Sequence, residues 1–314
     1  MRKVIGIGET VFDIIFKNNQ PISGKPGGSV FNCMISLGRF GKNPLFISEI
    51  GRDIVGEQVL QCMKDNGVGT DLMCTLPQER KSAIALAFLD ENEHPEYEFY
   101  NDYPEWGRLN YLVPQINEDD IIVFGSFFAL DEALREPILS LLREAREKKA
   151  IVYYDVNFRK TLVPRVRHLM PSYLENMEYI TIMKGSDEDF VNLYEENDSD
   201  VTYKEHIEFF SKNFICTKGA SGVSLYSNKN QRKDYPAQLV TPVSTVGAGD
   251  SFNAGIIYGL LHYGITYDDL KQGRVPIDVW DKIIDCGTQF SAHVCTRLEN
   301  YVSKEFAQSF SPKA

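Results

Sequence analysis

The feature that most restricts the possible folds is a series of short apolar runs along the chain. Each run is four to seven residues long and lacks a strict alternation of apolar and polar residues, which is typical of strands buried on both faces of a sheet. Six runs have this character: VIGIG (4–8), PLFISEI (44–50), IIVFG (121–125), IVYYD (151–155), YITIM (179–183) and FICT (214–217).

Stretches with helical periodicity lie between these runs. In residues 133–148 the apolar side chains recur at i, i+4, i+7, i+8 and i+11, which places them on one face of a helix. After Asp250, apolar residues recur every four positions, and Gly264 is a suitable C-terminal stop. Strands and helices alternate repeatedly, so the sequence predicts an α/β fold with a doubly wound parallel sheet and helices on both faces.

Two segments depart from this alternation and have the pattern of β-hairpins. Residues 10–26 contain TVFDIIF and a turn with Asn18 and Asn19, and residues 82–100 contain two apolar strands around the polar turn DENEHPE. We expect the two hairpins to pair into a small separate sheet. In an enzyme that acts on a sugar or a nucleotide, such a sheet would cover the site.

Charge and composition argue against several classes of partner. The 314 residues carry a formal net charge of −11, whereas nucleic acids and anionic membranes are bound by basic faces. We therefore expect neither nucleic acid nor a membrane as a partner. The first residues do not have the pattern of a signal peptide, and no segment approaches about 18 unbroken apolar residues. Because the six scattered cysteines also suit a reducing compartment, we expect a cytoplasmic location.

Several well-known nucleotide-binding and catalytic motifs do not occur in the sequence. GIG at residues 6–8 does not complete a dinucleotide-binding fingerprint, because Val11 occupies the position of the third glycine. The chain has neither the G-x-x-x-x-G-K-[ST] phosphate loop nor the H-R-D and D-F-G motifs of protein kinases. Its five histidines form no cluster and no H-E-x-x-H motif, so nothing supports a metallopeptidase.

The segment STVGAGDSFNAG, residues 244–255, places small residues before an aspartate and a helical pattern. In the simpler interpretation, Asp250 is the N-cap of that helix. In the other interpretation, the N–H groups of Gly247, Ala248 and Gly249 face an anion at the helix N-terminus, and Asp250 accepts a proton beside it. This segment alone does not decide between the two.

Two further segments combine permissive or buried backbone with polar side chains. Gly27 and Gly28 let the backbone approach a small polar molecule, and Asn32 follows in the first turn of a predicted helix. Asn157 and Arg159 follow the buried run IVYYD, at the carboxyl end of a strand, where parallel sheets bind ligands. Each segment also allows a purely structural interpretation, as a turn or as a solvated side chain.

The order of motifs along the chain is more informative than any single motif. GET-x-x-D is followed by GGSVFN, EIGRDIVGEQVLQCMKDNGV, EYEFYN, DVNFR, TKGASG and VGAGDSFNAG. Over roughly residues 3–297, this order resembles the ribokinase-like carbohydrate kinases, the phosphofructokinase-B family. Within that family, DVNFR and EFYN look most similar to fructokinases and 2-keto-3-deoxygluconate kinases.

The resemblance implies both a domain organisation and a reaction. The organisation is a single ribokinase-like domain over residues 1–314, with a lid built from about 10–26 and 82–112. The reaction is the transfer of a phosphoryl group from ATP to a sugar hydroxyl, with Mg²⁺ held mainly by the phosphates and water. No residue of this chain is assigned as a metal ligand.

The resemblance also implies three groups of site residues. The catalytic group has Asp250 as the base, with an anion hole formed by Gly247, Ala248 and Gly249. The substrate-binding group is Asp13, Gly27, Gly28, Asn32, Asn157 and Arg159. The nucleotide-binding group is Ser186, Asp189, Thr217, Gly219 and Gly222.

This chain departs from the family pattern in four places. Ser244 replaces an aspartate that helps hold a monovalent cation, and Glu299 replaces a glycine near the same cation, so potassium activation is in doubt. Ser186 and Asp189 replace the asparagine and glutamate of an N-x-x-E motif, which shortens the reach of these oxygen ligands. Asn101 replaces a lid arginine, and the loss of that cation favours a neutral ketose over an acidic sugar.

The implied function is therefore an ATP-dependent sugar kinase, with a primary hydroxyl of D-fructose as the first choice of acceptor. Ketodeoxygluconate kinase and, less favoured, a ribose or nucleoside kinase are the alternatives within this class. A weakly active sugar or nucleotide sensor is the alternative from another class, because Ser244, Ser186 and Glu299 depart from the pattern. The habit of the family further implies a homodimer that pairs through the lid sheet.

Overall fold

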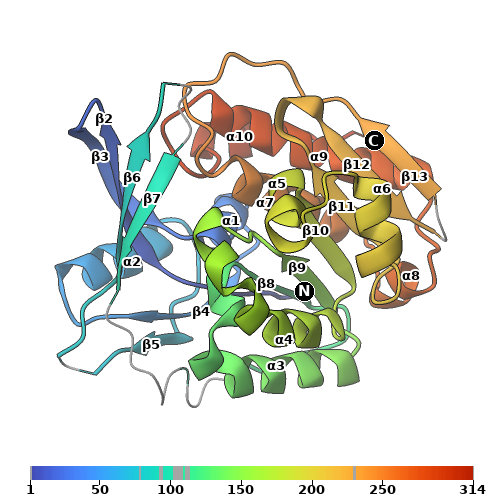
Figure 1. The fold of residues 1–314 in the computed structure, drawn as a ribbon, viewed down its shortest axis with the longest axis horizontal. Helices are drawn as coiled ribbons and strands as arrows, with labels where there is room; N and C mark the ends of the chain where they lie inside the picture. Colours follow the sequence, from blue (N-terminus) through green and yellow to red (C-terminus); the bar gives the residue numbers. More distant parts are fainter. Residues whose placement is uncertain are drawn as a thin grey trace.

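The main element of the fold is a nine-stranded sheet, in the order β13-β12-β11-β10-β9-β8-β1-β4-β5 (Figure 1). The computed structural model describes residues 2–77, 79–91, 95–101, 109, 114–228 and 231–313. The strands from β11 to β5 run parallel, and β12 and β13 are antiparallel to their neighbours. The strands of this sheet are β1 (Val4–Ile7), β4 (Leu45–Ile50), β5 (Met73–Thr75), β8 (Ile121–Gly125), β9 (Ile151–Asp155), β10 (Ile182–Ser186), β11 (Phe214–Thr217), β12 (Val223–Ser227) and β13 (Gln231–Tyr235).

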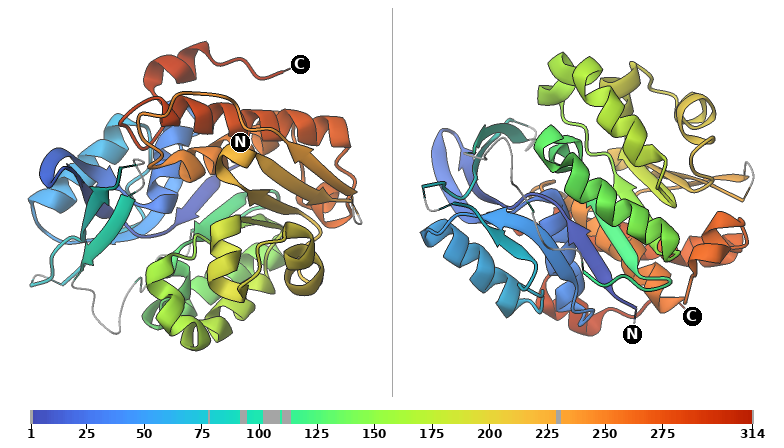
Figure 2. Two further views of the ribbon diagram at one scale, coloured as in Figure 1. Left: turned by 45° about the horizontal axis from the view of Figure 1, so that its top comes forward. Right: turned by 90° about the horizontal axis from the view of Figure 1, so that it is seen from below.

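The sheet separates two hydrophobic cores, because successive residues of a strand point to opposite faces. Val4 and Ile151 belong to one core, and the residues that follow them, Ile5 and Val152, belong to the other. Helices α1, α2, α7 and α9 contribute to the first core, and α3, α4 and α5 to the second; Figure 2 shows helices on both faces of the sheet. Because both faces are covered, the strands have the unbroken apolar runs seen in the sequence.

The helices follow the predicted alternation with the strands. In the described part of the chain, none of them combines the length and hydropathy that a membrane span requires. The helices are α1 (Ser29–Arg39), α2 (Ile54–Asp65), α3 (Arg135–Glu147), α4 (Val166–Met177), α5 (Asp187–Tyr194), α6 (Ser199–Thr202), α7 (Ala248–His262), α8 (Tyr267–Lys271), α9 (Ile277–Cys295) and α10 (Lys304–Ser309).

The two predicted hairpins form a separate four-stranded lid sheet in the order β3-β2-β6-β7, beside the main sheet (Figure 1). Asn18 and Asn19 both have positive φ, 51° and 59°, which is the backbone of a two-residue hairpin turn. Strands β2 and β6 pair in parallel and so join the two hairpins. The strands of the lid sheet are β2 (Val11–Lys17), β3 (Gln20–Gly27), β6 (Ile84–Leu89) and β7 (Pro95–Tyr100).

The lid sheet confirms the expectation of a small second sheet beside an α/β core. Within the predicted lid segments, residues 92–94, 102–108 and 110–112 lie outside the described residues. The organisation of residues 1–314 as a single domain stays a prediction.

One predicted strand is displaced along the chain. The sequence predicts a strand over 179–183, but β10 spans Ile182–Ser186. The turn after α4 includes Tyr179, whose N–H donates to the carbonyl of Asn176 at 3.1 Å, so the strand begins later. At its other end the strand continues through Lys184, because this charged side chain is buried beside a carboxylate.

Candidate active site

A cavity of about 180 Å³ lies at the carboxyl ends of the parallel strands. The strand order reverses there, since the chain proceeds from β1 to β4 on one side and from β8 toward β11 on the other. Such a reversal leaves a crevice in which α/β sheets bind ligands. Tyr97 and Phe99 of the lid strand β7 and Asn32 of α1 also line the cavity. The wall therefore combines the main sheet, the lid and the start of a helix.

Asp250 lies between the first turns of two helices. Helix α7 begins at Ala248 after Gly247, so Asp250 is the third residue of the helix and not its N-cap. Its carboxylate accepts hydrogen bonds from Ser29 Oγ at 2.9 Å and from Asn32 Nδ2 at 2.8 Å, both on α1. The N-cap interpretation of Asp250 is therefore wrong, and the residue instead lines the cavity.

The surroundings of Asp250 suit a group that exchanges a proton near neutral pH. Burial, and to a lesser extent the charge of Asp155, raise the pKa of Asp250, whereas the hydrogen bond from Asn32 and the charge of Arg159 work to lower it. The net result is a pKa of about 6. A general base is most efficient when its pKa lies close to the working pH. Asp250 can therefore be ionised at neutral pH and still accept a proton.

The glycines before Asp250 shape the start of α7. Gly247 has φ of 79°, and a Cβ there would collide with the backbone carbonyl of Asn300, so only glycine fits. Gly247 and Gly249 line the cavity, where the first N–H groups of a helix favour an anion. Ala248 is not among the described residues that line the cavity, and its N–H donates to the carbonyl of Thr245 at 3.2 Å.

Asp13, on lid strand β2, is another carboxylate in this cavity, and it is buried. It accepts a hydrogen bond from Asn300 Nδ2 at 3.1 Å. Burial and the charge of Asp250 raise the pKa of Asp13, and the charge of Arg159 works to lower it, with a net pKa of about 7. A Cβ on Gly27 would collide with the Asp13 carboxylate, so Gly27 makes room for this side chain.

The remaining predicted substrate residues lie on the same cavity. Gly28, Asn157 and Arg159 all line it, and Gly28 has φ of 127° with no space for a side chain beside the carbonyl of Glu9. The Arg159 guanidinium lies over the ring of Tyr97, 4.9 Å from its centre. Burial works to lower the pKa of Arg159, but the neighbouring Tyr97 and carboxylates more than offset it, so the group keeps its positive charge.

The predicted nucleotide residues lie elsewhere. Ser186 and Asp189 form the capping box of α5: Ser186 N donates to Asp189 Oδ2 at 2.6 Å, and Asp189 N donates to Ser186 Oγ at 3.1 Å. Thr217 Oγ1 donates to the carbonyl of Gly185 at 3.4 Å. The five predicted nucleotide residues all belong to the described part of the chain, and none of them lines the cavity.

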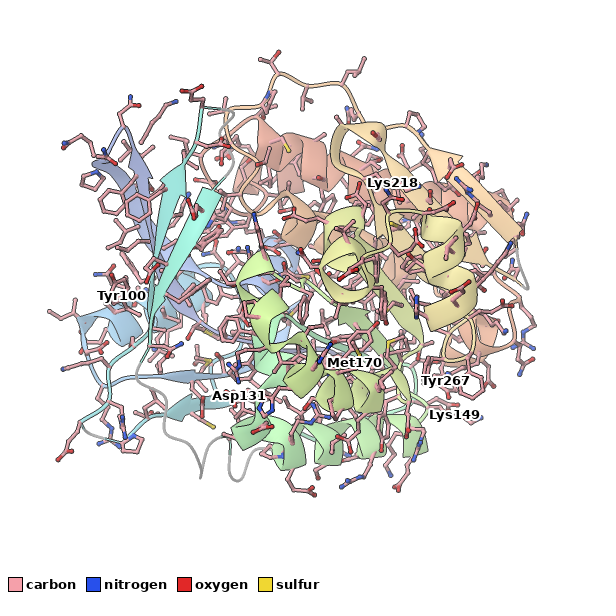
Figure 3. All side chains as sticks on the ribbon, viewed as in Figure 1. Tyr100, Asp131, Lys149, Met170, Lys218 and Tyr267 are labelled. Atoms are coloured by element: carbon pink, nitrogen blue, oxygen red, sulfur yellow. The ribbon has the colours of Figure 1, made fainter. Side chains whose placement is uncertain are left out.

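The loop that follows Thr217 begins away from the lid. Gly219 and Gly222 have positive φ, 50° and 97°; Gly219 begins a short 3₁₀ turn and Gly222 directly follows it. In Figure 3, Lys218 lies on the opposite side of the view from Tyr100, which ends the lid strand β7. The structure thus separates most of the predicted site residues into a group on the cavity and a group around α5 and this loop. Gly27 and Ala248 adjoin the cavity residues Gly28, Gly247 and Gly249 in the chain but are not among the described residues that line it.

Sequence reasoning missed several residues of the cavity, and four of them are polar or charged side chains that bear on its chemistry. Ser29 holds Asp250, and Glu9, Asp155 and Lys184 line the wall. Glu9 and Asp155 each stand inside a recognised motif, GET and DVNFR, and their position there was the available signal. Lys184 directly follows an apolar run, and a charged residue that extends a buried strand is a signal for a functional role.

The two departures near the expected cation site have local partners. Ser244 is buried, and its Oγ accepts a hydrogen bond from Val246 N at 3.2 Å. Glu299 forms an ion pair with Arg39 at the end of α1, with 3.3 Å between Oε2 and the guanidinium nitrogen. Both side chains thus take part in contacts within the protein, and altered potassium dependence stays a prediction.

Comparisons with known proteins agree with the geometry. A family model described as pfkB family carbohydrate kinase matches residues 1–274. The chain is 29% identical over 268 residues to a fructokinase of Rhizobium leguminosarum bv. trifolii, covering 82% of this chain and 79% of that protein. It is 25% identical over 246 residues to 5-dehydro-2-deoxygluconokinase 2 of Bacillus cereus, covering 75% of this chain and 73% of that protein.

A solved structure shares the fold. The crystal structure of a fructokinase with bound ATP from Xylella fastidiosa superimposes with a TM-score of 0.83 at 20% sequence identity, covering 98% of each chain. The ribokinase-like arrangement of a large sheet with a separate lid sheet is therefore confirmed for this chain.

Proposed function

The chain belongs to the pfkB family of carbohydrate kinases, and on this basis we propose that it is a fructokinase. It would transfer the γ-phosphoryl group of ATP to a primary hydroxyl of D-fructose. The observation that carries the proposal is the position of Asp250, a half-buried carboxylate held by two donors of α1 beside the glycine-rich start of α7. A base and an anion-binding helix N-terminus are the two parts that phosphoryl transfer to a hydroxyl needs at one place.

In the proposed mechanism, Asp250 accepts the proton of the sugar hydroxyl as that oxygen attacks phosphorus. The N–H groups at Gly247 and Gly249 stabilise the charge on the equatorial oxygens of the phosphoryl group. Asn32 is placed to contact both the base and the sugar. Its Nδ2 donates to Asp250, and its buried Oδ1 has no hydrogen-bond partner among the described residues. A sugar hydroxyl that donates to this oxygen would satisfy it.

The charges of the cavity support a neutral sugar. The carboxylates of Glu9, Asp13, Asp155 and Asp250 line the cavity against two cations, Arg159 and Lys184. A substrate carboxylate would therefore face more anionic than cationic groups there. This supports D-fructose over ketodeoxygluconate, in agreement with Asn101 in the lid. Arg159 is the observation that favours the second candidate, an acidic keto sugar, because a guanidinium recognises a carboxylate well.

ATP and Mg²⁺ complete the proposed reaction. ATP is bound in the Xylella fastidiosa fructokinase structure, which supports ATP as the donor here. In the described residues, no group of three or more His, Cys, Asp or Glu side chains is arranged to hold a metal ion. Mg²⁺ sheds its water reluctantly, so it would be held mainly by the nucleotide phosphates and water. Asp155 and Asp189, which lie close enough to influence each other's charge, are carboxylates that could contact it. Mg²⁺ would neutralise phosphate charge during transfer.

The lid sheet supports the proposed homodimer. Three large apolar side chains of this sheet are exposed, Ile22 by 44%, Phe88 by 38% and Tyr100 by 57%. An exposed sheet with apolar residues is a surface that a second copy can cover. Sedimentation velocity of the parent and of Phe88→Glu tests this, since a lid dimer predicts that the charged variant shifts toward the monomer.

A sugar panel is the experiment that tests the proposed function. ADP release is measured with purified protein, ATP and Mg²⁺, with and without K⁺, for D-fructose, tagatose, ketodeoxygluconate, ribose and adenosine. We expect the highest kcat/KM with D-fructose. A clear preference for ketodeoxygluconate would replace fructose by the second candidate. If no sugar is turned over, titration calorimetry with the same sugars tests the sensor, which would bind one of them without releasing ADP.

A further inference from the structure

Lys184 is a buried cation that the proposed mechanism does not yet use. It lies on β10 directly across from Asp155 on β9, in register in the parallel sheet. Its side chain is 5% exposed, and its ammonium group lies 3.0 and 3.1 Å from the two carboxylate oxygens of Asp155. An ammonium group has three N–H donors, and this carboxylate is a partner for only two of them.

A chain of hydrogen bonds holds Asp155 in place. Asn253 Nδ2 donates to Asp155 Oδ2 at 2.6 Å, and Tyr153 OH donates to Asn253 Oδ1 at 2.9 Å. Asn253 belongs to α7, the helix whose first turn carries Asp250. The ammonium group of Lys184 is therefore held in a fixed relation to the start of α7.

Lys184 also lies close to the start of α7. A Cβ on Gly249 would be 3.5 Å from Lys184 Nζ, which places the ammonium group next to the glycine-rich turn. Both residues line the cavity, together with Asp250. Burial works to lower the pKa of Lys184, but the charges of Asp155 and Asp189 more than offset it, and the group stays protonated. A fixed positive charge and a helix N-terminus thus converge on one part of the cavity.

We propose that Lys184 is a catalytic residue whose ammonium group donates a hydrogen bond to the phosphoryl group during transfer, while Asp155 holds it in position. This proposal rests on the assignment of the cavity to phosphoryl transfer under the proposed function. In a site that excludes water, a fixed cation is worth more than a flexible one, because it needs no rearrangement as charge develops. The competing explanation is structural: Lys184 would serve only to neutralise the buried carboxylate of Asp155.

A cycle of four proteins separates the two explanations: the parent, Lys184→Met, Asp155→Asn and the double variant. If Lys184 only balances the charge of Asp155, its replacement should not change kcat once Asp155 is already neutral. If Lys184 acts on the phosphoryl group, Lys184→Met lowers kcat by about 10²–10³-fold in both backgrounds. The double variant removes both charges of the pair, so neither is left buried without the other, and the comparison remains possible if Lys184→Met alone does not fold.

Nucleotide binding gives a readout that does not depend on turnover. The four proteins are titrated with Mg²⁺ and either ADP or the non-hydrolysable analogue adenylyl imidodiphosphate. A direct contact to the terminal phosphoryl group predicts that Lys184→Met weakens the triphosphate analogue by about 10-fold or more and ADP much less, in both backgrounds. Equal weakening of both nucleotides, or no effect in the Asp155→Asn background, would overturn the proposal.

The control variant breaks another lysine–aspartate pair, one that lies away from the cavity. Lys233 Nζ lies 2.7 Å from Asp281 Oδ1, and neither residue lines the cavity in the described part of the chain. Lys233→Met should leave kcat and both nucleotide affinities unchanged. If the parent turns over no sugar at all, the proposed function fails, but the difference between the triphosphate analogue and ADP still decides the role of Lys184.

Discussion

Two regions of the predicted site are built in different ways. The sugar side, which contains Asp13, Asn32 and Asp250, depends on contacts between residues far apart in the chain: Asn32 donates to Asp250 across 218 positions. The nucleotide side, which contains Ser186 and Asp189, depends on a pair three positions apart in the capping box of α5. A buried long-range contact fixes two elements relative to each other, whereas a capping box organises only one helix start.

This difference predicts what substitutions on each side will do. The sugar side is arranged before any ligand is present, so its side chains should affect turnover strongly. The polar groups of the nucleotide side already have local partners, so their loss should affect stability and ATP affinity more than the chemical step. Four sets of variants test this contrast.

The largest effect is expected for Asp250→Asn. Loss of the general base should lower kcat by about 10²–10⁴-fold, measured as ADP release with the best sugar of the panel. Asp268→Asn is the control, because Asp268 also stands in the first turn of a helix, α8, and is half-exposed. A variant at Asp250 as active as the parent would mean that this carboxylate is not the base.

The parent should also show the ionisation of Asp250 in its pH profile. Because burial raises the pKa of Asp250 to about 6, kcat/KM should fall about tenfold per pH unit below that value, as the base becomes protonated. The fall should depend on the free protein and not on the sugar chosen. A profile flat down to pH 5 would contradict a base with this pKa.

Alanine substitutions at Gly247 and Gly249 separate an effect on folding stability from an effect on anion binding. Gly247→Ala should lower the free energy of unfolding by about 1–3 kcal/mol and activity by about 10²-fold, because its Cβ collides with the Asn300 carbonyl. In Gly249→Ala the new Cβ would have only Lys184 Nζ nearby, at 3.5 Å. The free energy of unfolding should therefore be unchanged or up to about 1 kcal/mol higher. Its activity should nonetheless fall, since the methyl group enters the space of the anion. Normal activity of Gly249→Ala would place the phosphoryl group elsewhere.

Asp13→Asn should weaken sugar binding but stabilise the folded protein above neutral pH. Burial raises the pKa of Asp13 from 3.8 to about 7, so between about pH 4 and 7 the folded protein holds an extra proton and the unfolding free energy falls as pH rises. The variant, which cannot ionise, should therefore be more stable than the parent at pH 8, with a gain that shrinks as pH falls through 7. Urea unfolding at several pH values measures this, and the KM for the sugar should rise about tenfold or more. A gain that does not change with pH would contradict the role of ionisation.

The smallest effects are expected on the nucleotide side. Ser186→Ala and Thr266→Ala each remove the hydroxyl of a capping box, in α5 and α8 respectively. Both should lower the free energy of unfolding by about 1 kcal/mol, measured in urea. Only Ser186→Ala should raise the KM for ATP, by a few-fold, with kcat almost unchanged. Equal ATP affinity in the two variants would leave Ser186 as a helix cap alone.

The sequence was sufficient to predict most of the fold. Strands such as 121–125 and 151–155 have the predicted bounds, because a sheet buried on both faces leaves an unbroken apolar signal. The lid hairpins were recognisable by their turn chemistry at Asn18 and Asn19. Strand β10 is displaced because the apolar run ends before Lys184, and no local pattern shows that a partner strand supplies a carboxylate.

The candidate site was predictable where motifs mark it and not where distant contacts build it. Asp250, Asn32 and Arg159 stand in recognisable segments and line one cavity. Ser29 was missed because its hydroxyl reaches Asp250 across 221 positions, a distance over which a sequence pattern carries no information. The N-cap interpretation of Asp250 failed because the helix begins earlier than the sequence suggested. Its N-cap is Gly247, and Asp250 lies within the first turn, where its side chain faces α1.

The hydrogen bond from Asn300 to Asp13 joins residues 287 positions apart. During synthesis at about 5–20 residues per second, Asn300 is made roughly 15–60 s after Asp13. Over that interval the first hairpin of the lid has no amide to receive its carboxylate, and burying that group would be unfavourable. The nascent chain should therefore keep this hairpin in water until the segment that carries Asn300 has been made.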